Sequence, residues 1–143
     1  MKKLASLLLA ALCVCALLCA CGANEAYDLN GFEDGKTVPR LTYDMIDKIV
    51  ISGMTLDRDQ ADTFINLYND LVLRYKEGET TPDFSASVVL KDGTIIELSD
   101  NSPDELQIII KSADGKVRSH TENGLPMKGV NPELVEYIKD FGK

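Results

Sequence analysis

The sequence has few of the residues on which enzyme active sites commonly depend. It has no tryptophan and a single histidine, His120, among 143 residues, and it has no cysteine beyond position 21. A histidine-based active site or zinc centre needs several converging groups, and one histidine does not provide them. His120 is expected on the exposed side of a strand. Its neighbour Ser119 would then point to the opposite face, which excludes a serine–histidine pair.

Catalytic and cofactor motifs are also missing. The sequence contains no glycine-rich phosphate loop, no Gly-x-Ser-x-Gly elbow and no His-Glu-x-x-His zinc motif. The acids Asp57, Asp59 and Asp62 resemble the start of a calcium loop, but the glycine and the glutamate that such a loop requires are absent. A second polar group could bind a cation weakly, but a solvated loop is the preferred interpretation; it comprises Asp100, Asn101, Asp104 and Glu105. We therefore expect no enzyme, no cofactor and no metal site, with carboxylate-only chemistry as the alternative.

All four cysteines lie close together near the start of the chain, at positions 13, 15, 19 and 21. They belong to an uncharged apolar run that follows Met1-Lys2-Lys3, a pattern typical of a secretory signal peptide. The run from Leu4 to Ala20 is slightly shorter than the ~18 residues of a spanning helix, and no basic cluster follows it. We therefore expect cleavage rather than an uncleaved anchor. A discarded segment holds neither a disulfide nor a metal, so Cys21 is the cysteine that remains.

The segment Leu18-Cys19-Ala20-Cys21-Gly22 resembles the bacterial lipobox, which has an aliphatic residue at −3 and a small residue at −1. The other three cysteines each follow leucine or valine, which are too bulky for the cleavage position. In the lipoproteins that this motif resembles, the cysteine receives a diacylglyceryl group, with palmitate among the expected acyl chains, and becomes the new N-terminus. The resemblance implies lipidation of Cys21 on the extracytoplasmic face of the cell membrane. Two acyl chains at ~0.8 kcal/mol per buried methylene make such an anchor firm.

Cleavage after Ala20 would leave a strongly acidic chain. The whole sequence has 15 basic and 23 acidic residues, and residues 1–20 contain two of the lysines and no acid, so the formal charge of the remainder is 13 − 23 = −10. Nucleic acids are excluded as partners, because phosphate binding depends on clustered lysine and arginine. The acidic surface favours solubility in an extracytoplasmic space.

We divide the sequence into a signal peptide (1–20), a lipidated cysteine with a flexible tether (21–41) and a single globular domain (42–143). The tether has scattered glycine, asparagine and acids without periodicity, and would span on the order of 25 Å. The alternative is that Leu29 and Phe32 pack on the domain.

Within the domain, residues 45–52 are predicted to form a strand that ends at Gly53. A helix is expected to start at Asp57, because Gln60 completes a capping box, and to end near 77–78. Its apolar residues recur at helical spacing, at Ala61, Phe64, Ile65, Tyr68, Leu71, Val72 and Tyr75.

A hairpin is predicted next, with strands at 84–90 and 94–99 around a two-residue Asp92-Gly93 turn. Further strands are expected at 106–111 and 116–121, and Asn131-Pro132 is expected to open a closing helix. The order β-α-β-β-β-β-α predicts an α+β fold. In it, one long amphipathic helix and a C-terminal helix would pack on a mostly antiparallel five-stranded sheet.

Alternation along the strands leaves an apolar set on the face opposite the first helix, where polar residues are the norm. We call this set, a candidate interaction patch, the outer stripe: Val50, Val89, Ile95 and Ile109. One interpretation is that the closing helix covers it in order to bury Leu134, Ile138 and Phe141. The other is an exposed surface for a protein, lipid or glycan, or for self-association.

The layout of lipobox, tether, strand, amphipathic helix, strands and closing helix resembles small surface lipoproteins of Gram-positive bacteria that have no assigned activity. Solute-binding lipoproteins share the anchor but generally need two lobes and a longer chain. The resemblance implies a non-catalytic binding or accessory module at the cell envelope, whose partners would be the membrane, through its lipid, and an envelope or membrane protein. The alternatives are a protective or inhibitory surface protein and a carboxylate-dependent hydrolase.

Overall fold

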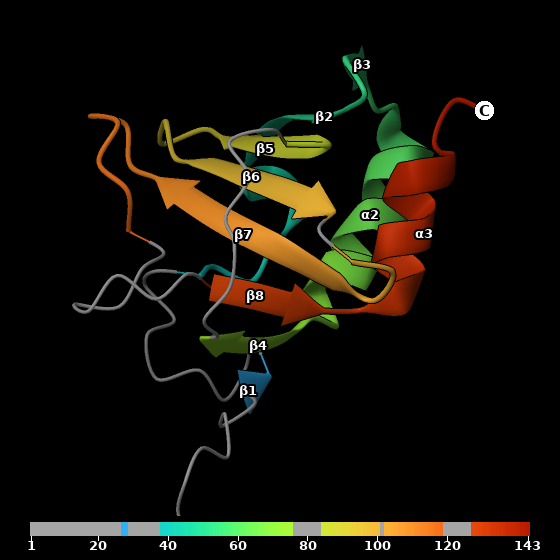
Figure 1. The fold of residues 1–143 in the computed structure, drawn as a ribbon. Coiled ribbons are helices and arrows are strands. Elements are labelled where there is room, and N and C mark those ends of the chain that lie inside the picture. Colours follow the sequence, from blue (N-terminus) through green and yellow to red (C-terminus); the bar gives the residue numbers. More distant parts are fainter. Residues whose placement is uncertain (1–26, 29–37, 76–83, 101, 119–126) are drawn as a thin grey trace, which may run out of the picture.

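The computed structural model describes residues 27–28, 38–75, 84–100, 102–118 and 127–143. These residues adopt an α+β fold with one antiparallel sheet, a 3-10 turn η1 (Tyr43–Met45) and two α-helices, α2 (Arg58–Asn69) and α3 (Pro132–Asp140). The strands are β1 (Tyr27–Asp28), β2 (Ile46–Ile51), β3 (Met54–Thr55), β4 (Val72–Tyr75), β5 (Ala86–Leu90), β6 (Ile95–Asp100), β7 (Glu105–Lys111) and β8 (Met127–Val130). Their order across the sheet is β1-β4-β8-β7-β6-β5-β2-β3 (Figure 1).

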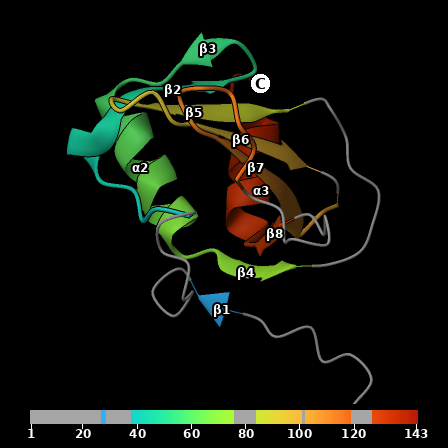
Figure 2. The same cartoon turned by 90° about the vertical axis from the view of Figure 1, so that its left-hand side faces the viewer.

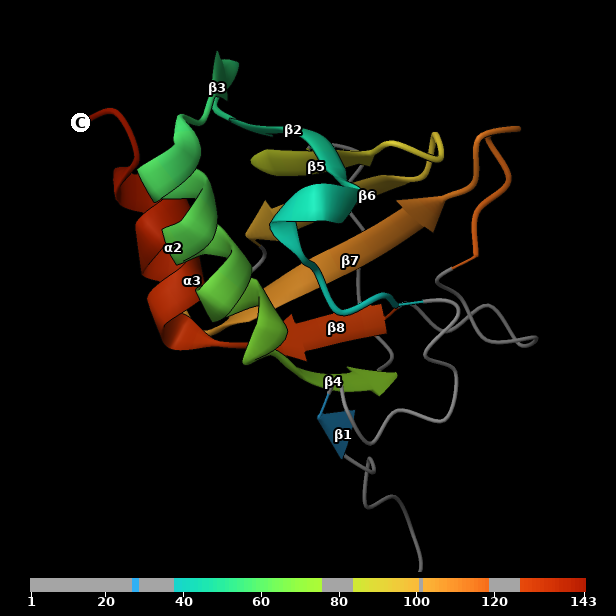
Figure 3. The same ribbon diagram turned by 180° about the vertical axis from the view of Figure 1, so that it is seen from behind.

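The helices and η1 pack against one face of the sheet. Figure 3 shows η1 and α2 in front of the strands when the molecule is seen from behind, with α3 beside α2. Figure 2 shows both helices between β2 and β5 on one side and β4 on the other. The side chains enclosed there form the core, which includes Ile49, Ile51, Phe64, Tyr68, Ile96, Leu98, Leu106, Ile108, Ile110, Leu134 and Ile138.

The predicted capping residues take part in the structure as the sequence suggests. The side chain of Asp57 accepts a hydrogen bond from Gln60 N, and the Gln60 side chain accepts one from Asp57 N, so the capping box is present. Asn131 caps α3 by accepting hydrogen bonds from Glu133 N and Leu134 N. Both helices therefore begin where local side-chain chemistry satisfies their first free N–H groups.

The predicted hairpin is also present, with one difference in its turn. Leu90 N donates to Thr94 O at 2.8 Å, so the connecting loop contains Lys91 as well as Asp92 and Gly93. Gly93 has φ of +88°, the left-handed conformation that closes such a three-residue loop. Phe84, the first residue of the predicted strand 84–90, precedes β5 and is 52% exposed.

The predicted five-stranded sheet and long helix are wrong. The described strands number eight, of which β1 and β3 contain two residues each, and α2 contains only 12 residues. Helix α2 stops because the chain turns at Asp70 and continues as β4, which pairs with β8. Leu71 and Leu73 are buried while Val72 is 37% exposed, an alternation with the period of a strand.

The predicted last strand is likewise misplaced. At 116–121, Val117 makes an isolated bridge to Lys111, and residues 119–121 lie outside the described ranges. The strand that pairs with β7 on its far side is β8, which the sequence analysis did not predict. Its sequence, Met-Lys-Gly-Val, has little of the β-branched and aromatic character that marks a strand.

The folded part extends before the expected boundary at residue 42. Val38 and Leu41 are each 1% exposed and belong to the core. Tyr27 pairs with Leu73, and Asp28 pairs with Val72, so β1 adds an outermost strand beside β4.

The closing helix α3 does not cover the outer stripe. It buries Leu134, Val135 and Ile138 in the same core as α2, and Tyr137 Oη donates to the carbonyl oxygen of Gln60 in α2 at 3.1 Å. Phe141 follows the helix and packs partly exposed against Tyr137. The sheet face seen in Figure 1 therefore has no described helix over it.

Candidate functional site

The residues of the outer stripe lie on four neighbouring strands, on the sheet face that no described helix covers. Val89 in β5 stands directly opposite Ile95 in β6. Val50 is opposite Ser87, and Ile109 is opposite Glu97, so each lies diagonally across from a member of this central pair. Opposite and diagonal neighbours on one sheet face are close enough for side-chain contact. The stripe is therefore continuous across β2, β5, β6 and β7.

Each member of the stripe is half-buried. The stripe is thus neither fully covered nor fully exposed, because every one of its side chains is only partly accessible. A fully solvated sheet face would carry polar residues at these positions. The stripe thus leaves aliphatic surface in contact with solvent that a partner could remove from water.

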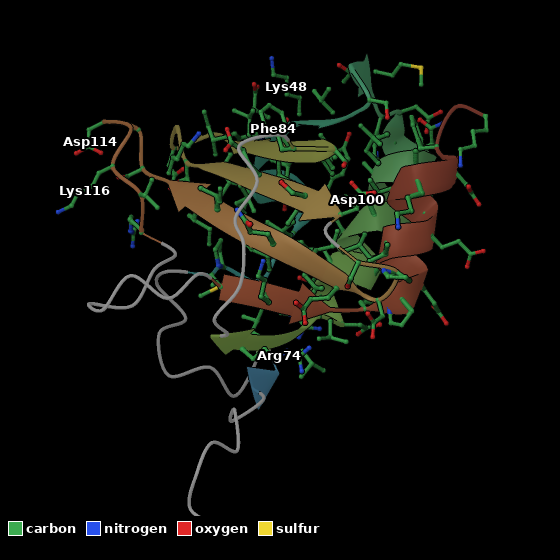
Figure 4. All side chains as sticks on the ribbon, viewed as in Figure 1. Lys48, Arg74, Phe84, Asp100, Asp114 and Lys116 are labelled. Carbon is green, nitrogen blue, oxygen red and sulfur yellow. The ribbon has the colours of Figure 1, made fainter. Side chains whose placement is uncertain are left out.

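Charged side chains border the stripe. Lys111 Nζ lies 2.8 Å from Glu97 Oε1, and this pair joins β6 and β7 beside Ile95 and Ile109. Lys48 is exposed and stands opposite Val89 (Figure 4). The side-chain exposures of Lys111 and Glu97 are 34% and 12%, so the ion pair is partly shielded from solvent. The stripe consequently has an apolar centre and a charged rim.

A row of polar side chains continues the same face toward β4. Register places Ser99, Gln107, Lys128 and Arg74 side by side across β6, β7, β8 and β4. Gln107 is fully buried, and Lys128 Nζ lies 3.5 Å from its Oε1. Arg74 forms an ion pair with Glu105 that reaches over β8. These interactions satisfy charges that burial would otherwise penalise.

This polar row was not predicted from the sequence. Gln107 interrupts the apolar run from Leu106 to Ile110, and its alternation with them placed it on the outer face. The position of Gln107 on the outer face could therefore be predicted. The sequence did not indicate that Lys128 and Arg74 lie beside Gln107, because the strands β8 and β4 were not predicted.

Three of the acids considered as calcium or cation ligands have local structural roles. Asp57 caps α2, and Asp100 accepts a hydrogen bond from Ser85 and lies 3.8 Å from Lys139 Nζ (Figure 4). Asp104 accepts a hydrogen bond from Ser102 at 3.1 Å. Among the described residues, no group of three or more histidine, cysteine, aspartate or glutamate side chains is arranged to hold a metal ion.

The shifted pKa values of four side chains also have structural causes. The hydrogen bond from Thr94 N lowers the pKa of the Asp92 carboxyl, and the hydroxyl of Ser112 lowers the pKa of Asp114. Both aspartates stabilise tight turns. Burial raises the pKa of the Tyr68 hydroxyl, and burial together with the charge of Asp57 raises that of Tyr137.

A concave surface lies between α2 and α3. This open groove has a volume of about 470 Å³ and is lined by Gln60, Glu136, Tyr137, Asp140, Phe141 and Gly142. Asp140 is already paired with Lys143 at 2.7 Å. The groove combines acids with two aromatic rings whose centroids are 5.9 Å apart, but it contains no polar side chain left unpaired in its interior among the described residues.

Cys21, the predicted lipidation site, lies outside the described residues, and so does His120. Neither helix in the described part is long and apolar enough to cross a membrane. Comparison of the chain with protein-family models, with curated proteins and with solved structures finds no match.

Proposed function

We propose that the protein is a non-catalytic binding module held at the extracytoplasmic face of the cell membrane by lipid on Cys21, and that it binds a protein of the envelope through the outer stripe. The observation that carries the binding role is the continuous, partly exposed stripe on a sheet face that no described helix covers. The lipobox at residues 18–22 supports the anchor.

A protein partner fits this surface better than a lipid surface does. An apolar centre surrounded by charged groups is the usual composition of a protein interface. The Glu97–Lys111 pair at the rim offers both signs of charge to a partner. A formal charge of −10 after cleavage would disfavour close contact of the domain with anionic lipid.

The stripe contains enough apolar surface to contribute usefully to binding. Full burial of a valine or isoleucine side chain stabilises by about 1.5–3 kcal/mol, and about a third of that or less remains available at each of these positions. The four side chains together then offer at most about 2–4 kcal/mol before the entropic cost of association. A complex of weak or moderate affinity is consistent with that range. Two partners anchored in the same membrane meet at a raised effective concentration, so weak contacts are sufficient.

The anchor is tested by replacing Cys21 with serine in the producing cell. The variant should remain uncleaved or be released, and its labelling by a radioactive fatty acid should disappear. Fatty-acid labelling that survives C21S would refute the anchor.

The binding surface is tested by placing a photo-crosslinking amino acid at position 95 in intact cells. The matched control is position 54, because Met54 is also exposed and apolar but pairs with Ile51, whose side chain faces the core. We expect a discrete crosslinked species at position 95, its loss when Val89 is changed to glutamate, and no such species at position 54. Equal crosslinking at both positions, or a species insensitive to V89E, would contradict the assigned surface.

A further inference from the structure

Strand β1 lies very close in sequence to the proposed anchor. Tyr27 pairs with Leu73 of β4, and it follows Cys21 by only six residues. An extended chain advances at most about 3.6 Å per residue, so the α-carbon of Tyr27 lies within about 22 Å of that of Cys21. The sheet edge formed by β1 and β4 is therefore held near the bilayer whenever Cys21 is lipidated.

The other edge of the sheet is far from this attachment. The order β1-β4-β8-β7-β6-β5-β2-β3 places β3 seven strand spacings from β1, or about 34 Å along the sheet at about 4.8 Å per spacing. Figure 1 shows β1 and β4 at one end of the molecule and β2 and β3 at the opposite end. The short segment keeps the β1 edge within about 22 Å of the anchor, whereas the β3 edge lies about 34 Å farther along the sheet and is not held by that segment.

We infer that the anchored domain stands on the membrane with its β1–β4 edge nearest the lipid and its β2–β3 edge pointing away. The outer stripe, on β7, β6, β5 and β2, then begins three strand spacings from β1 and ends six spacings from it, about 14–29 Å along the sheet. The stripe then faces parallel to the membrane plane, about 14–29 Å from β1 along the sheet. Its partner would be a membrane protein whose extracytoplasmic part rises to the same level.

This inference rests on the proposed lipidation of Cys21, and it adds an orientation that the anchor alone does not specify. A tether that ran freely to Thr42 would let the domain turn in any direction. Pairing of β1 with β4 removes most of that length, because residues 27 and 28 already belong to the sheet.

The orientation is tested with fluorescent labels on single introduced cysteines in the lipidated protein, purified from the producing cell and reconstituted into phosphatidylcholine vesicles. One variant is Val72→Cys in β4 and the other is Met54→Cys in β3. Both positions are exposed apolar strand residues, with exposures of 37% and 45%; β4 lies next to the β1 edge, and β3 forms the other edge. The lipidated protein has no other free thiol, since no cysteine follows position 21.

We expect a quencher attached to lipid headgroups to reduce the fluorescence at position 72 several-fold more than at position 54. Insertion of a flexible 20-residue linker between Ala23 and Asn24 should abolish the difference. Equal quenching at both positions, or stronger quenching at position 54, would overturn the orientation while leaving the anchor intact. Protein that fails to float with the vesicles would overturn the anchor and the orientation together.

Discussion

Asn69, the last residue of α2, holds the backbone of Leu41 through two reciprocal hydrogen bonds. Its Oδ1 accepts from Leu41 N at 2.8 Å, and its Nδ2 donates to Leu41 O at 2.8 Å. One amide side chain thereby satisfies both polar backbone groups of a residue that is 1% exposed. This bond pair joins the segment before η1 to the end of α2, and it lets Leu41 enter the core without leaving unsatisfied backbone atoms.

Replacement of Asn69 by alanine should lower the free energy of unfolding by about 1–3 kcal/mol, because it leaves two buried backbone groups unpaired. The matched control is Asn66→Ala, an exposed asparagine one turn earlier in the same helix, which should change stability by no more than about 0.5 kcal/mol. Urea denaturation measures both. Equal losses of stability for the two variants would contradict the role of the two Asn69–Leu41 hydrogen bonds.

Asn131 joins the two helices as well as capping one. Its Oδ1 caps α3, and its Nδ2 donates to Leu67 O in α2 at 2.8 Å. Asn131→Ala should cost about 1–3 kcal/mol by removing both functions. Asn131→Ser keeps an oxygen that can cap α3 and lacks the donor to Leu67, so thermal unfolding should place it between the wild type and N131A. A serine variant as unstable as the alanine variant would show that the cap contributes nothing.

Tyr68 is fully buried, and its hydroxyl has no hydrogen-bond partner among the described residues. Burial raises its pKa, so the folded protein keeps the phenol proton at a pH where the unfolded chain, near pH 10, loses it. The stability that Tyr68 contributes is therefore complete below about pH 10 and declines as the pH rises above that value.

Tyr68→Phe should be neutral at pH 7 or stabilise by up to about 1–2 kcal/mol, because it removes an unpaired buried hydroxyl while keeping the ring. Its loss of stability between pH 9 and 11, measured by urea denaturation, should be smaller than that of the wild type. A large destabilisation at pH 7 would indicate that the hydroxyl has a partner.

Gly129 in β8 allows two core side chains to approach the strand closely. A Cβ atom at this position would lie 2.8 Å from Ile108 Cδ1 and 2.9 Å from Leu71 Cδ2. Gly129→Ala should therefore destabilise the protein by about 1–3 kcal/mol. Adding Ile108→Val removes Cδ1, so a double-mutant cycle should show favourable coupling between the two changes. Strictly additive losses would mean that the contact imposes no strain.

Local chemistry made part of the fold predictable. The capping box of Asp57 and Gln60, the glycine at position 93 and the Asn131-Pro132 cap act within three or four residues, and each is found where expected. The outer stripe was predictable for a similar reason. Alternation along a strand determines which residues share a face once the strand itself is identified.

The elements around β4 and β8 were not predictable in this way. Leu71, Val72 and Tyr75 fit the helical spacing of the preceding residues, whereas Leu71 and Leu73 fit the period of a strand. The chain adopts the strand because β8 pairs with it from Val72 to Tyr75, and β8 has almost no strand signal of its own. A pattern among neighbouring residues carries no information about a strand partner more than fifty residues away in the sequence.

By itself, the sequence determined the helix starts, the central hairpin, the acidic charge and the set of aliphatic residues that share the outer face, because these follow from neighbouring residues and from composition. Only the tertiary structure decided where α2 ends, that β1, β4 and β8 extend the sheet, and that Gln107, Lys128 and Arg74 lie in one row. Those outcomes depend on hydrogen bonds and buried contacts between distant segments, whose free energy exceeds the weak local preferences of the residues involved.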